Sequence, residues 1–251
     1  MILGGRVGTA AQFRQLDKLW PKALKRAGIE YLHSKEARNG SGQFRGRPDS
    51  ERDKVIISLH ALASHYSLFS FAVKLSQADY QEHYRPGPHP RRQPIDSMYG
   101  MCFRLALVDL PRRVKANVKS SDGVEVNFVL ETGHRNCGDA VRIFNHAKET
   151  APAELRDLLG RITLGNKREF PGLQAADAAA LGTALAENQN APLTQLKPGT
   201  TLAEARAIAR YNSPAYRFEV TAAVLEEVRR NMLADEERRR TYWRTNRAHK
   251  A

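Results

Sequence analysis

The chain has 251 residues, of which 41% are hydrophobic and 27% are charged, a balance that excludes fibrous and disordered classes and is typical of a globular protein. Lysine and arginine number 40 against 27 aspartates and glutamates, and the resulting net charge of +13 favours a polyanionic partner. The two cysteines are too few for a disulfide scaffold or a cysteine-rich zinc site, so we expect a reducing, cytoplasmic location.

The first residues have the pattern of a buried strand that is already under way. Ile2, Leu3 and Val7 surround two glycines, with no turn or polar lead before them and no secretory signal. We therefore expect the chain to begin inside its domain, with an antiparallel neighbour of this strand encoded before Met1. Nowhere does the sequence approach the roughly 18 apolar residues that a membrane-spanning helix needs.

Helices and strands alternate along the rest of the chain, which indicates an α/β or α+β protein. Thr9 is placed to cap the first helix and Gly28 to stop it, although Pro21 should kink or split it. Residues 85–94 hold four prolines and three arginines and should form an exposed loop. Helices are expected over residues 9–27, 49–64, 95–110, 138–148, 172–186 and from 221 onward, and strands over residues 2–7, 65–76, 124–130 and 161–164.

The helix predicted over residues 172–186 carries a carboxylate on an apolar face. Leu173, Asp177 and Ala180 lie on one side of it by the i, i+3, i+4 rule. An unpaired carboxylate there would cost several kcal/mol, so Asp177 should be paired, hydrogen-bonded, capping a helix or bound to a metal. A helix cap or an arginine pair is the structural alternative to a functional role.

A second candidate is the polar loop after the strand over residues 124–130. Glu131 opens this loop, and His134, Arg135 and other polar residues follow among glycines. Ligands bind at the carboxyl ends of strands in open α/β sheets, which makes this loop a site candidate. The structural alternative, a helix cap made by Asn136 or Asp139, does not explain Glu131 and His134 together.

The third candidate is His33 with Glu36, which lie one helical turn apart if a local helix forms. A solvent-exposed pair is the alternative interpretation. Glu36, Glu131 and Asp177 together offer the hard oxygen ligands that magnesium and manganese prefer.

Four phrases, ILGGRVGTAAQF, YLHSKE, VNFVLETGHRN and FPGLQAADAAALG, resemble in this order and spacing the domain-of-unknown-function 3800 family, whose fold is similar to that of ribonuclease H. The resemblance implies a ribonuclease H-like mixed sheet flanked by helices over residues 1–190, followed by a helical, basic C-terminal extension over 191–251. It also implies catalytic roles for Asp177 on a helix, Glu131 at a strand end, and His33 with Glu36, with magnesium or manganese held by the three acids.

The chain departs from the family at its start, because members usually begin with a strand bearing an Asp-Glu-Ser-Gly-like string that this sequence lacks. The implied activity is metal-assisted phosphodiester hydrolysis, which the loss of the first-strand acid would weaken or abolish in this form. A nucleic-acid-binding module without catalysis, or a subunit that binds protein through the helix over residues 95–110, are the alternatives. The residues expected to contact nucleic acid are Arg85, Arg91, Arg92, Arg135 and Lys167.

Overall fold

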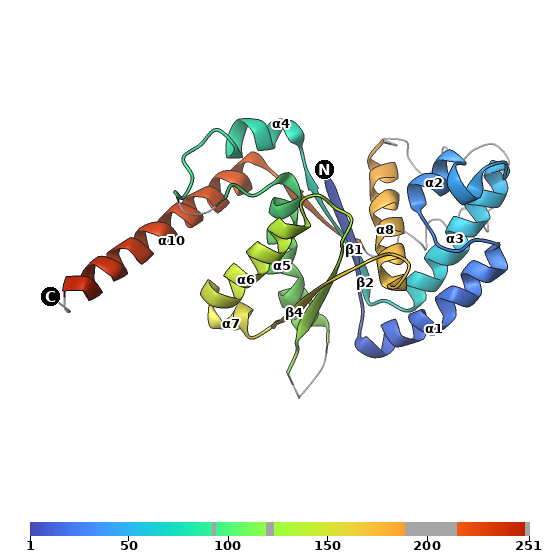
Figure 1. The fold of residues 1–251 in the computed structure, drawn as a ribbon, viewed down its shortest axis with the longest axis horizontal. Coiled ribbons are helices and arrows are strands. Elements are labelled where there is room, and N and C mark those ends of the chain that lie inside the picture. The colour runs from blue at the N-terminus through green and yellow to red at the C-terminus, as the bar shows by residue number, and fades with distance from the viewer. Residues whose placement is uncertain (92–93, 119–122, 189–214, 249–251) are drawn as a thin grey trace.

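A computed structural model describes residues 1–91, 94–118, 123–188 and 215–248, and Figure 1 shows their arrangement. The elements alternate between helix and strand along the chain. They are β1 (Ile2–Val7), α1 (Ala10–Ala27), α2 (Ser34–Asn39), the 3-10 helix η1 (Gly42–Phe44), α3 (Asp49–His65), β2 (Phe69–Leu75), α4 (Gln77–Asp79), the π-helical segment η2 (Tyr80–Tyr84), α5 (Met98–Asn117), β3 (Val126–Glu131), α6 (Cys137–Thr150), α7 (Ala153–Arg156), β4 (Leu159–Gly165), α8 (Pro171–Asn188), β5 (Ala215–Val220) and α10 (Ala222–Ala248).

The fold is mixed α/β, with the described strands in two sheets. In the first, β2 pairs antiparallel with β1 and parallel with β5, so that the order is β1-β2-β5. The second is a parallel pair, β3 and β4. The strands of the described residues therefore do not join into the one mixed sheet that the family resemblance implies.

The first sheet has a distinct group of helices on each face. Figure 1 shows α1, α2, α3 and α8 on one side of β1 and β2, with α5 and α6 on the other. Leu3 and Val7 of β1 pack against the core that contains α5. On the opposite face α8 comes so close that a Cβ on Gly4 would lie 2.6 Å from the Cα of Ala180, which explains the glycine.

The face between β1 and α3 buries a charged side chain. Arg6 is 9% exposed, and its guanidinium donates to the Ser64 hydroxyl at 2.9 Å and to that of Ser67 at 3.3 Å. Its Nη2 also lies 3.0 Å from Nε2 of His60. Burial lowers the pKa of Arg6 to about 10.

Several predicted elements are confirmed with shifted ends. α1 has the Thr9 capping box and the left-handed Gly28 cap, but it is not split at Pro21. β1 pairs antiparallel with β2 on one edge, and the described residues place no strand on its other edge, so a neighbour encoded before Met1 stays a prediction. Pro48, rather than Asp49 or Ser50, occupies the N-cap position of α3.

The predicted boundary at residue 190 lies outside the described residues, and the described part of the chain resumes after it with β5. β5, which the sequence analysis missed, belongs to the first sheet, so the region after residue 190 contributes to the main fold before it becomes helical at Ala222. α10 packs on η2 near its start and then runs away from the body in Figure 1. Among the helices described, none combines the length and the apolar character needed to cross a membrane.

Candidate active site

Two of the predicted acids meet at one lysine. The ammonium nitrogen of Lys167 lies 3.3 Å from Oε2 of Glu131 and 3.2 Å from Oδ1 of Asp177. Lys167 is well covered, with a side-chain exposure of 13%, whereas Glu131 and Asp177 are 43% and 26% exposed. We call these three residues the acid–lysine cluster, and its geometry places two carboxylates around a single cationic group.

The parallel pairing of β3 and β4 accounts for the first half of the cluster. Glu131 ends β3 opposite Gly165, which ends β4, so both strands deliver their carboxyl ends to one edge. The following turn is fixed by Asn166, whose side-chain oxygen accepts hydrogen bonds from the backbone N–H groups of Arg168 and Glu169 at 2.9 and 3.1 Å. Lys167 therefore projects from a defined turn two residues after the strand.

Asp177 joins the cluster from α8 and also serves α2. Its Oδ2 accepts a hydrogen bond of 2.9 Å from the backbone N–H of Ser34, the first residue of α2. The helix-cap interpretation is thus confirmed, and the ion pair is made with a lysine instead of an arginine. One carboxylate holds the start of α2 with one oxygen and the Lys167 ammonium with the other.

His33 and Glu36 form a pair beside this cap. The two side chains approach to 3.8 Å between Nδ1 and Oε1, which is too long for a hydrogen bond. Within the described residues, His33 Nδ1, Ser34 Oγ and Glu36 Oε2 are buried without a hydrogen-bond partner. A Cβ on Gly42 would come within 2.1 Å of Glu36 Oε2, so the glycine leaves room for that carboxylate.

The oxygen atoms around Lys167 and at the start of α2 meet some, but not all, of the requirements of a hard divalent cation. Glu131 and Asp177 already share one cation, and the three orphaned polar atoms at the start of α2 could face a cation or its water. The structure does not gather the predicted triad of Glu36, Glu131 and Asp177 into one group. In the part of the chain that is described, no group of three or more histidines, cysteines, aspartates or glutamates is arranged to hold a metal ion.

The loop after Glu131 contributes an aromatic contact rather than a ligand set. The His134 ring stacks on Tyr99, with ring centroids 4.2 Å apart and an interplanar angle of 22°. Burial, assisted by the charges of Cys137 and Glu131, raises the pKa of Tyr99 to about 12. Asn136 sits at the N-cap of α6 but makes no side-chain cap bond.

Asp139 does not cap α6 but binds the N-cap residue of α5. Its Oδ2 accepts a 2.9 Å hydrogen bond from the backbone N–H of Ser97, which is the N-cap residue of α5, and its Oδ1 lies 3.3 Å from Arg142. Asp139 therefore fastens the loop before α5 to α6.

The basic residues predicted to bind nucleic acid are dispersed. Arg85 is exposed and donates to Gln81, Arg91 is exposed and its backbone N–H donates to Glu236, and Arg135 is exposed in the loop after Glu131. Arg92 lies outside the described residues. Lys167 belongs to the acid–lysine cluster instead of the open surface.

Two functional candidates were missed by sequence reasoning. The Arg168 guanidinium lies 5.2 Å from the centre of the Tyr31 ring, forming a cation–aromatic pair next to Lys167. Gln174 is only 1% exposed and hydrogen-bonds three separate segments. A glutamine one turn before Asp177 in an otherwise apolar string was the available signal for the second.

Searches with protein-family models, among curated proteins and among solved structures give no match to this chain. The resemblance to the domain-of-unknown-function 3800 family, and with it the ribonuclease H-like fold, therefore remains a prediction.

Proposed function

We propose that the protein is a divalent-metal-dependent phosphodiesterase of ribonuclease H-like type that acts on nucleic acid at the acid–lysine cluster. The observation that carries this proposal is the convergence of Glu131 and Asp177 on one cation position, 3.3 and 3.2 Å from the same ammonium nitrogen. These acids come from a strand end and from a helix, so the convergence depends on the fold rather than on sequence neighbourhood.

In this proposal each residue of the site has a separate role. Glu131 and Asp177 hold the cation, with the His33–Glu36 pair next to it, and Lys167 exchanges its carboxylate partners for a phosphate oxygen of the substrate. A bound magnesium or manganese ion supplies an activated water and offsets charge on the phosphate. Lysine suits this exchange because its ammonium is a compact charge on a flexible stem.

Charge supports nucleic acid as the substrate. The net charge of +13 draws in a polyanion, the exposed Arg168 directly follows Lys167 along the chain, and the exposed Arg135 lies four residues after Glu131. Phosphate contacts release counterions, so binding should weaken steeply as salt rises.

The test combines binding and cleavage of labelled single- and double-stranded DNA and RNA. We expect binding with a log–log salt slope on the order of several, together with cleavage that requires manganese or magnesium. Glu131→Gln should leave binding intact and reduce cleavage by roughly 100-fold or more, because even outer-shell changes at metal sites cost 10–100-fold. Glu169→Gln removes the same charge from an exposed position two residues from Lys167 and should cleave normally. Cleavage without added metal, or equal loss in both variants, would contradict the proposal.

A nucleic-acid-binding module without catalysis is the second candidate. Lys167 already pairs with both carboxylates and Asp177 already caps α2, so each acid has a partner without a metal. This candidate predicts the same salt-dependent binding with no cleavage at any metal concentration. Flat salt dependence would instead favour the protein-binding subunit.

A further inference from the structure

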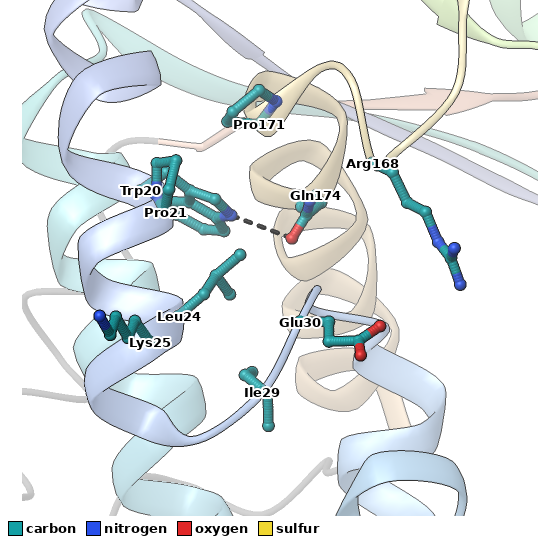
Figure 2. A pocket seen from close by; sticks show the side chains of 9 residues that line it. All are labelled: Trp20, Pro21, Leu24, Lys25, Ile29, Glu30, Arg168, Pro171 and Gln174. Carbon is teal, nitrogen blue, oxygen red and sulfur yellow. Dashed lines mark hydrogen bonds between the residues drawn. The ribbon is translucent and has the colours of Figure 1, made fainter.

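Gln174 is a buried polar residue at the centre of three chain segments. Figure 2 shows it facing Trp20 at the pocket between α1, the segment that contains Ile29 and Glu30, and the turn before α8. Its side-chain oxygen accepts hydrogen bonds from Nε1 of Trp20 at 2.9 Å and from the backbone N–H of Leu32 at 2.7 Å. Its nitrogen donates at 2.7 Å to the backbone carbonyl of Lys167.

The bond to Lys167 is the one that reaches the acid–lysine cluster. Gln174 and Asp177 lie one helical turn apart on α8, so the two residues share a face. Asp177 contacts the ammonium of Lys167 while Gln174 holds its carbonyl, so α8 fixes this lysine at both ends.

The same helix face also fixes the segment before α2. Gln174 accepts the N–H of Leu32, and Asp177 accepts the N–H of Ser34 two residues later. The His33 backbone is therefore held between two bonds to α8. A change at Gln174 would release the lysine turn and one of these two anchors together.

We propose that Gln174 is a positioning residue that sets the place of the Lys167 ammonium between Glu131 and Asp177. The lysine ammonium lies at the end of a flexible four-carbon stem, so its position is reproducible only if the lysine backbone is held in place. The catalytic side of this inference rests on the proposed function, in which misplacement of a reacting group by about 1 Å costs on the order of 100-fold in rate. The structural part of the inference, the position of the Lys167 ammonium, does not depend on any catalytic activity.

The experiment compares Gln174→Met with Trp20→Phe, which removes one of the groups that donate to the Gln174 side-chain oxygen. Gln174→Met removes the bond to Lys167 together with those to Trp20 and Leu32, whereas Trp20→Phe removes one donor and leaves the Lys167 bond in place. Amine acetylation, followed residue by residue by mass spectrometry without metal or nucleic acid, reports how well each ammonium is held. Lys148, which donates to the backbone carbonyl of Leu159, is the internal reference for general loosening.

We expect Gln174→Met to accelerate the labelling of Lys167 several-fold while the labelling of Lys148 is unchanged, and Trp20→Phe to change neither. Equal acceleration at both lysines, or none at Lys167, would overturn the positioning role. If Gln174→Met does not fold, Gln174→Asn keeps an uncharged amide but is one methylene shorter, so it cannot reach the Lys167 carbonyl from the same backbone position, and the same labelling result is expected.

Cleavage assays separate this inference from the proposed function. With manganese and nucleic acid, Gln174→Met should lower kcat more than it raises KM, because Lys167 is one of several basic residues that would contact the substrate but the one that sits between the two acids. Accelerated labelling in a protein whose wild type never cleaves would uphold the positioning role and refute the phosphodiesterase. A wild type that cleaves, with a Gln174→Met variant that cleaves equally well, would overturn the positioning role alone.

Discussion

Replacing Asp96 with alanine should lower the free energy of unfolding by about 3–5 kcal/mol, the cost of breaking a buried ion pair. The Asp96 side chain is fully buried, and its two oxygens accept from Nε of Arg104 at 2.7 Å and from Nη2 of Arg142 at 2.5 Å. Alanine would leave the Arg104 guanidinium without this carboxylate and Arg142 with Asp139 alone as its partner. The triad ties the loop before α5 to α5 and α6, so the loss should be global.

Asp109 on α5 provides the matched control. It pairs with Arg113 one turn away, but the side chains are 35% and 36% exposed. Asp109→Ala should therefore cost less than about 1 kcal/mol, as exposed pairs do. Urea unfolding of both variants measures the difference, and equal losses would show that the Asp96 triad contributes no more than a surface pair.

Lowering the pH from 7 to 4 should destabilise the protein through His60. Burial and the nearby charge of Arg6 lower the pKa of His60 from 6.5 to about 4, against a smaller opposite effect of a hydrogen bond with the Ala178 backbone. In the unfolded chain His60 therefore binds a proton below pH 6.5, whereas in the folded chain it stays unprotonated until about pH 4. Stability is lost progressively over that interval, by up to about 3 kcal/mol.

The His60→Gln variant isolates this contribution. Glutamine can still accept from Arg6 but does not titrate, so the loss of stability between pH 6.5 and 4 should shrink by the His60 share. Urea unfolding at several pH values gives the two slopes. Identical slopes for the wild type and the variant would show that His60 is not held neutral.

The parts of the fold with strong local signals were predictable. The Thr9 cap and Gly28 stop of α1 were read correctly, because capping depends on a few neighbouring residues. Of the kink or split expected at Pro21, the split does not occur, since α1 buries Trp20 and Leu24 on either side of the proline and that packing outweighs one lost backbone bond. Local helix propensity does not include the packing energy that tertiary contacts supply.

Contacts between residues far apart in the sequence could not be predicted from local patterns. β5 pairs in parallel with β2, about 145 residues earlier by register, and no local pattern encodes that partnership. In the site, strand-end and helix-face arguments brought out Glu131 and Asp177, which the structure places at one lysine. Lys167 was predicted as a nucleic-acid contact because nothing in its own neighbourhood reveals that a turn points it at two carboxylates.

The central claim, that the acid–lysine cluster binds a divalent cation, is tested most directly by thermal melts with and without millimolar manganese. A ligand at 100 times its Kd stabilises the folded state by about 2.7 kcal/mol. The wild type should be stabilised, Asp177→Asn should lose the response, and Lys167→Met should respond more strongly because the competing ammonium is gone. Equal manganese-induced shifts in the wild type and Asp177→Asn, or no shift in any of the three proteins, would contradict the account.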